Sequence, residues 1–122
     1  MVEVICDTNF LIHLATRRIK NIDNLDMEIG SISFIVPEVV KNELTKLQQI
    51  PEKTQEITQT LNFIKKFKII QINGIYADEE LIKYVKNKRS IIGTMDKGLK
   101  NKIKKLDSSI LSIHNDKIIL ER

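Results

Sequence analysis

Two aspartates follow short apolar segments that are expected to form strands. Asp7 comes after residues 2–6 and Asp96 after residues 90–94. Because the carboxyl ends of parallel strands meet at one edge of a sheet, both carboxylates are expected to emerge there. Asn9 could orient the Asp7 carboxylate or a bound water, or be an ordinary turn residue. Each aspartate is also a favourable helix N-cap, a structural role that needs no chemistry.

Two further acids lie on the apolar faces of expected helices. Glu43 is three residues after Val40, and Asp78 is three residues before Leu81. Side chains with this spacing share one helix face, which here should point toward the core. Glu79 also lies near that face. A charge in such a position needs a partner.

Carboxylates gathered at one place repel one another unless they are protonated or share a cation. Oxygen ligands without Cys or a well-placed His favour a hard cation, so we expect Mg²⁺ or Mn²⁺. Two such ions held about 4 Å apart can activate water and stabilise the leaving oxygen in phosphodiester hydrolysis. The acids therefore indicate metal-dependent cleavage of a phosphodiester.

The charge distribution points to a polyanionic partner. The chain has a net charge of +4, and nine Lys or Arg residues fall between positions 83 and 105, where Asp96 is the only acid. A solvated, lysine-rich helix face is the alternative explanation. Among the aromatic residues, Tyr84 alone is placed where it could stack on a base. The residues expected to contact phosphates are Lys86, Lys88, Arg89, Lys97, Lys100 and Lys102.

Length and composition predict one ordered domain over residues 1–122. Hydrophobic residues make up 42% of the chain and charged residues 30%, which is typical of a folded protein. Cys6 is the only cysteine, so a disulfide within the chain is impossible. The sequence shows neither a signal peptide nor an apolar run of membrane-spanning length, so we expect a cytoplasmic protein without membrane association.

The hydrophobic pattern alternates between short strands and amphipathic helices. Strands are expected at 2–6, at a stretch ending at Val36, at 68–72 (buried), 90–94, 109–113 and 117–120. Helices are expected after Asp7, from Pro37 as a first helical residue, after Pro51, at 77–88 and at 96–105. Such alternation predicts an α/β fold with a parallel sheet covered on both faces.

Four segments together resemble PIN-domain nucleases: CDTNFLI, VPEVVKNELTKL, YADEELIKYV and IIGTMDKGLKNKIKK. The last two are most similar to the ribosomal-RNA-processing branch, of the small-subunit processome type, and its archaeal relatives. The resemblance spans nearly the whole chain. It implies a three-layer α/β/α fold and a metal-dependent endoribonuclease that acts on single-stranded or structured RNA.

The resemblance also implies roles for individual residues. The acidic set of the family corresponds to Asp7, Glu43, Asp78 and Asp96, with Thr8, Asn9 and Thr94 as hydrogen-bonding support. Glu79 stands where that branch has a second Asp and could reach a metal directly or through water. Gly93 replaces the more usual Ala, a change expected to matter little.

Three roles follow from these patterns. Maturation of ribosomal RNA is the leading hypothesis. A VapC-type toxin ribonuclease with an antitoxin partner is the second. The third is a non-catalytic RNA-binding ribosome-assembly factor, which is a binding protein rather than an enzyme. The resemblance also implies a homodimer.

Overall fold

The computed structural model describes residues 2–20 and 31–121. Its strands form one sheet in the order β3-β2-β1-β4-β5-β6. They are β1 (Val2–Cys6), β2 (Ile32–Pro37), β3 (Lys68–Ile70), β4 (Ile91–Gly93), β5 (Ser109–His114) and β6 (Lys117–Glu121). All neighbours pair in parallel except β6, which runs antiparallel to β5. The expected parallel sheet and terminal pairing strand are confirmed.

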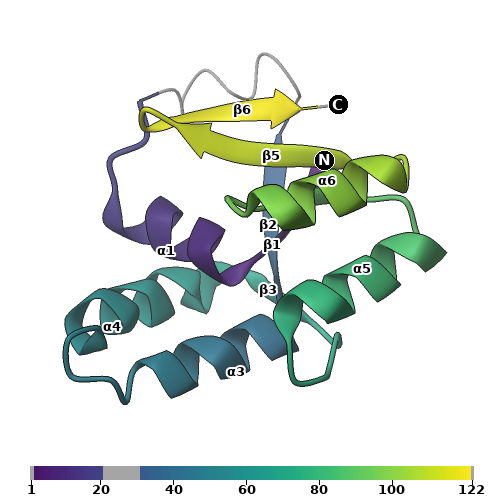
Figure 1. Cartoon of the computed structure of the whole chain (residues 1–122). Helices are drawn as coiled ribbons and strands as arrows, with labels where there is room; N and C mark the ends of the chain where they lie inside the picture. Colours follow the sequence, from purple (N-terminus) through teal and green to yellow (C-terminus); the bar gives the residue numbers. More distant parts are fainter. Residues whose placement is uncertain (1, 21–30, 122) are drawn as a thin grey trace.

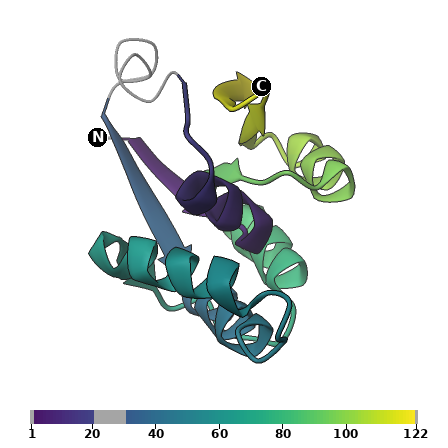
Figure 2. The same ribbon diagram turned by 90° about the vertical axis from the view of Figure 1, so that its left-hand side faces the viewer.

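Helices cover both faces of this sheet. They are α1 (Thr8–Thr16), α3 (Glu38–Leu47), α4 (Thr54–Phe63), the short 3₁₀ helix η1 (Ile64–Lys66), α5 (Ala77–Asn87) and α6 (Lys97–Lys105). Helix α4 packs on α1 and α3, and α5 packs on α6. The α1 and α4 helices lie on one side of β1 and β2, and α5 and α6 on the other (Figure 1). Figure 2 views the molecule from the α1 and α4 side. The fold is the expected three-layer α/β/α arrangement.

The strand order places a crevice between β1 and β4. The chain moves from β1 to β2 to β3 in one direction and then returns to β4 on the other side of β1. Because such crossovers are right-handed, this reversal puts the two sets of helices on opposite faces. In open parallel sheets, the crevice at this switch point is where ligands bind.

The central strands are buried on both faces, which explains their continuous apolar sequences. Val4, Ile5 and Cys6 in β1 are at most 5% exposed. Helices contribute one apolar face each, with Phe10, Leu44 and other side chains that are fully buried. This core fixes the strand ends from which the acidic side chains project.

Two expectations about elements are wrong. Pro37 is the last residue of β2 and the N-cap of α3, with φ −66° and ψ 144°, rather than the first helical residue. Proline restricts φ but leaves ψ open, and pairing with Ile70 selects the extended form. β3 is an exposed edge strand rather than a buried one. Lys68 and Ile69 face solvent, and among the described strands β3 has β2 as its only neighbour.

None of the helices in residues 2–20 and 31–121 is long and apolar enough to cross a membrane.

Candidate active site

Asp7 and Asp96 emerge at the same edge of the sheet, as expected. Cys6 at the end of β1 pairs with Gly93 at the end of β4. The Asp7 amide donates to the Gly93 carbonyl at 2.8 Å, which carries the pairing one residue beyond the strands. The two aspartates therefore flank the crevice at the switch point.

Thr94 links these two strand ends. Its hydroxyl donates to Oδ2 of Asp7 at 3.0 Å and accepts from the Asp96 amide at 3.2 Å. The side chain is fully buried. Since the Asp96 amide can only donate, the proton of the Thr94 hydroxyl points to Asp7. Thr94 therefore fixes the orientation of the Asp7 carboxylate.

Glu43 has two hydrogen-bond partners, which satisfies the expectation that an inward charge needs support. The Thr8 hydroxyl donates to Oε1 at 2.8 Å, and the Ala77 amide donates to Oε2 at 2.9 Å. Ala77 is the first residue of α5, whose N-cap Tyr76 offers no side-chain hydrogen bond. Glu43 thus takes one of the unpaired amides at this helix start and holds α1, α3 and α5 together.

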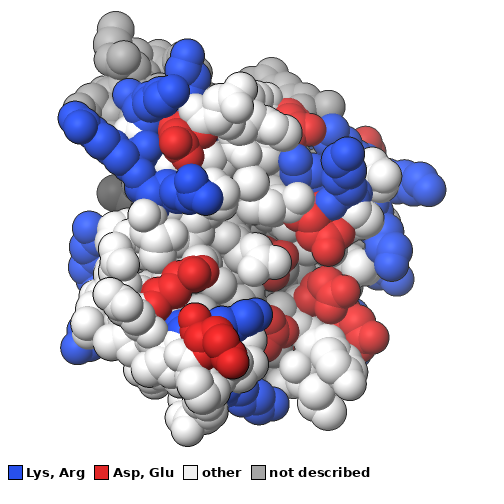
Figure 3. All heavy atoms as spheres, turned by 60° about the vertical axis from the view of Figure 1, so that its left-hand side comes forward, with Lys and Arg blue, Asp and Glu red and all other residues white. Residues whose placement is uncertain are grey.

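The four acids line one polar cleft of about 280 Å³. Thr8 and Asn9 also line this acidic cleft, as does Lys53 from the turn before α4. Asp78 is exposed, rather than turned toward the core, because it lies in the first turn of α5 at the sheet edge. In Figure 3, acidic side chains face one another across a shallow hollow in the right half of the view, with Lys and Arg side chains above them.

Burial raises the pKa of Asp7, and the charges of Glu43 and Asp78 raise it further. Hydrogen bonds from the Thr8 amide and the Thr94 hydroxyl act in the opposite direction. Burial is the main cause, and repulsion from the two neighbouring carboxylates adds to it. A cation among them would relieve the repulsion.

Asp96 caps a helix and also borders the acidic cleft. Its Oδ1 accepts from the Leu99 amide at 2.9 Å and so caps α6. The same side chain lines the acidic cleft. Glu79 is different: its side chain is exposed and is not part of the cleft lining, while its amide donates to the Asp78 carboxylate at 3.0 Å.

Most of the expected phosphate-binding residues are exposed, namely Lys86, Lys88, Arg89, Lys97 and Lys102. The expectation that Lys100 contacts phosphates is wrong. This lysine is only 8% exposed, and its amino group pairs with Glu121 at 3.1 Å. The helical period turns it toward β6, where its charge is already compensated. Tyr84 is half-buried and packs against the core, so it is not a freely exposed stacking surface.

Lys53 is the site residue that sequence reasoning missed. It is exposed and borders the acidic cleft, although nothing in its neighbours Glu52 and Thr54 marks it as functional. Its only signal is its place just before a helix expected after Pro51. A cation at this position suits a phosphate beside the acids.

The donor set of the acidic cleft fits a hard cation, since it offers several carboxylate oxygens. Within residues 2–20 and 31–121, no three His, Cys, Asp or Glu side chains are already arranged to hold a metal ion. Asp78 and Asp96 are exposed, so both can change rotamer without repacking the core. The chemistry of the donors is therefore suitable for a hard cation.

Two proteins of similar length resemble this chain in sequence. Ribonuclease VapC4 of Methanocaldococcus jannaschii is 29% identical over 127 residues, covering 96% of this chain and 94% of that protein. The PIN domain endonuclease Utp24 is 30% identical in its solved structure, with a TM-score of 0.80 over 98% of this chain and 91% of the other.

A third likeness concerns the fold alone. A domain of a functionally unknown protein from M. jannaschii superposes with a TM-score of 0.62 at 17% identity, covering 93% of this chain.

The family described as PIN like domain matches residues 4–115, which make up nearly the whole chain. The order of strands, the acids at the switch point and this match agree: the chain belongs to the PIN-like domain family.

Proposed function

We propose that this protein is a metal-dependent endoribonuclease that hydrolyses phosphodiester bonds of RNA in the acidic cleft. The observation that supports this most strongly is the convergence of Asp7, Glu43, Asp78 and Asp96, from four separate segments, on one cleft at the switch point of the sheet. The similarity to a protein named as a ribonuclease and to one named as an endonuclease supports the same activity.

In this proposal, Asp7, Asp78 and Asp96 would hold Mg²⁺ or Mn²⁺ with help from Glu43, and the ion would supply water activation and stabilisation of the leaving oxygen. Thr8 and Thr94 are positioning residues, because the hydroxyl of each donates a hydrogen bond to one of the carboxylates. Lys53 and the exposed basic residues of α5 and α6 hold the phosphate backbone. The variant Glu79→Gln tests whether the Glu79 carboxylate contributes to metal binding through water.

The decisive experiment compares Asp7→Asn with Asp107→Asn on a labelled RNA. Asp107 is an exposed residue with φ 60°, a conformation that Asn tolerates, so it is a matched control. We expect Asp7→Asn to abolish cleavage and Asp107→Asn to keep it. Calorimetric titration should show Mn²⁺ binding that Asp7→Asn weakens. Equal cleavage by both variants would refute the proposal.

We propose ribosomal RNA as the substrate class, on the resemblance of residues 76–85 and 91–105 to the processing branch of the family. The likeness to VapC4 supports the second candidate, a toxin ribonuclease paired with an antitoxin. Growth arrest on expression, relieved by a small neighbouring gene, would favour the toxin. Accumulation of a ribosomal RNA precursor on depletion, without such arrest, would favour processing.

The non-catalytic assembly factor is the remaining alternative, since a binding-only protein needs no metal. It predicts RNA binding without cleavage and no Mn²⁺ heat in the titration. A homodimer, implied by the resemblance, is also part of the proposal. Sedimentation equilibrium at several concentrations tests it.

A further inference from the structure

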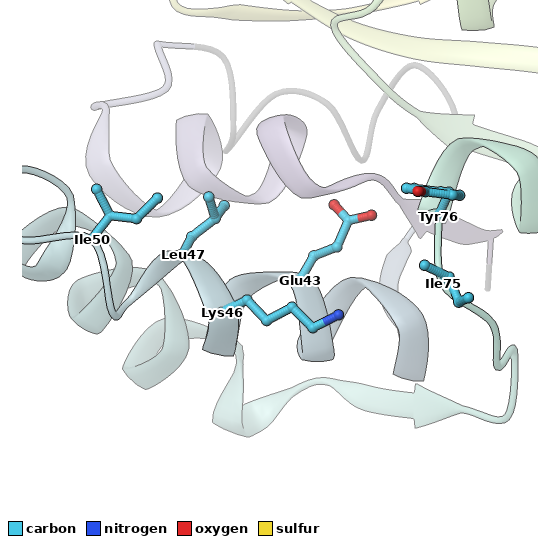
Figure 4. Close-up of a pocket in the computed structure, with 6 residues that line it drawn as sticks. All are labelled: Glu43, Lys46, Leu47, Ile50, Ile75 and Tyr76. Carbon is cyan, nitrogen blue, oxygen red and sulfur yellow. The ribbon is translucent and has the colours of Figure 1, made fainter.

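An apolar cleft adjoins the acidic one. It has a volume of about 470 Å³ and lies between α3 and the segment that precedes α5. Glu43 and Leu47 line both clefts, so the two lie side by side. Figure 4 shows the side chains of α3 on one side and those of Ile75 and Tyr76 on the other. The full lining of the apolar cleft is Glu43, Lys46, Leu47, Ile50, Ile75 and Tyr76.

The apolar cleft exposes large side chains to water. Tyr76 is 59% exposed, Ile75 69% and Ile50 39%. Isolated exposed apolar residues are common, but three that share one cleft form a patch of the kind that binds a ligand. The proposed cleavage reaction does not use them, so a different role remains for them.

The segment that carries Tyr76 is held in place. Gly74 has φ +149°, and a Cβ there would collide with the Glu80 side chain, so glycine lets Glu80 pack against the backbone. The Glu80 amide also donates to the Tyr76 carbonyl at 3.2 Å. On the other side, Glu43 accepts from the amide of Ala77. Tyr76 is therefore presented by an organised turn next to a proposed catalytic acid.

We propose that the apolar cleft binds one unpaired nucleobase of the RNA whose phosphate lies in the acidic cleft, with Tyr76 as its stacking surface. This inference rests on the proposed function, because the acidic cleft positions the strand. Every base has a face that stacks on an aromatic ring, so such a site requires a single-stranded substrate more than a particular sequence. A base inside a duplex is already stacked and cannot enter.

Charge supports RNA over an apolar protein segment as the occupant. Lys46 lines the apolar cleft and Lys53 lines the acidic one, so a cation is present in each. A polyanionic strand that crosses from one cleft to the other would meet both cations. Glu43, in the shared wall, has both oxygens engaged by Thr8 and Ala77.

The test uses single-stranded oligonucleotides, each with one abasic position, and measures binding by fluorescence anisotropy in EDTA and cleavage with Mn²⁺. For the intact strand we expect Tyr76→Ala to weaken binding about 5- to 150-fold, which is the range of one stacked base. Tyr76→Phe should bind like the wild type because it keeps the ring. Ile119→Ala, an exposed apolar truncation on β6, is the matched control and should change nothing.

The abasic series identifies the base. At one position, removal of the base should weaken binding by the wild type. On the strand that lacks this base, Tyr76→Ala should bind no more weakly than the wild type. If the wild type cleaves RNA while Tyr76→Ala binds every strand equally well, the base site is wrong and the nuclease stands. If the wild type fails to cleave any RNA, the proposed function itself fails. Loss of self-association in Tyr76→Ala with unchanged RNA affinity would make the cleft an interface between copies and overturn the inference.

Discussion

The Thr94 hydroxyl donates a hydrogen bond to Oδ2 of Asp7 at 3.0 Å and thereby joins the ends of two neighbouring strands. The two residues are 87 positions apart in the sequence. Asp7 also accepts from the Thr8 amide at 2.7 Å through Oδ1, so both of its oxygens are oriented. The geometry of the site thus depends on a hydroxyl that has no direct part in the proposed chemistry.

Replacing Thr94 with valine should lower RNA cleavage about 10- to 100-fold, as is usual when a hydrogen bond behind a metal ligand is lost. Valine has the same shape, so the buried position should remain packed. The Thr94 hydrogen bond lowers the pKa of Asp7, so its loss should raise that pKa. The acidic limb of the kcat/KM profile should then move to higher pH.

Thr94→Ser is the matched control because it keeps the hydroxyl, and its pH profile should coincide with that of the wild type. A uniform loss of kcat/KM at all pH values in Thr94→Val, with no displacement of the acidic limb, would show that Thr94 supports folding only.

Asp7→Asn should stabilise the metal-free protein at neutral pH. The pKa of Asp7 is raised in the folded state, so between its unfolded value of 3.8 and the raised folded value the native protein binds more protons than the unfolded chain. Stability therefore falls as the pH rises through this window. Above the window the ionised Asp7 destabilises the fold, and Asn removes that charge.

Thermal melts in EDTA across this pH range test the effect. The Tm of Asp7→Asn should exceed that of the wild type at pH 7, and the difference should shrink toward pH 3.8. Saturating Mn²⁺ should raise the wild-type Tm more than that of the variant, because only a bound ion stabilises the native state by mass action. A lower Tm for Asp7→Asn throughout would contradict the raised pKa.

The strand-end aspartates and Glu43 were predictable because their signals are local. A strand followed by Asp, or an acid at helical spacing from apolar residues, can be recognised within a few positions. The partners of these acids were not predictable in the same way. The Ala77 amide reaches Glu43 across 34 positions, and Lys53 and Tyr76 acquire their places only when α3, α4 and α5 pack together.

Lys97 and Lys100 belong to the same helix and should behave differently. Lys97 is exposed, whereas Lys100 is buried against Glu121. Hydrogen bonds from Ser112, Lys104 and Lys100 lower the pKa of Glu121 to about 2, so this carboxylate is charged under all ordinary conditions. Lys100→Met should therefore reduce stability without changing RNA binding.

Lys97→Met should weaken RNA binding and reduce the slope of log K against log salt by about 0.7, the value for one phosphate of a single strand. Anisotropy titrations at several salt concentrations, together with urea denaturation, separate the two effects. A loss of salt dependence in Lys100→Met would mean that this lysine leaves Glu121 to contact RNA.

Gly93→Ala should destabilise the protein, although the family resemblance suggests that alanine is acceptable here. A Cβ at this position would lie 2.8 Å from two atoms of the Phe10 ring, so the ring or β4 must move. Phe10 is fully buried, and overpacking of a core usually costs about 1–3 kcal/mol. The Gly93 carbonyl also accepts from the Asp7 amide, so a displaced β4 would disturb the site.

Denaturation of Gly93→Ala, Phe10→Leu and the double variant measures the coupling between the two residues. The smaller side chain in Phe10→Leu makes room for the methyl group, so the double variant should be less destabilised than the sum of the single changes. Strict additivity would place the cause elsewhere.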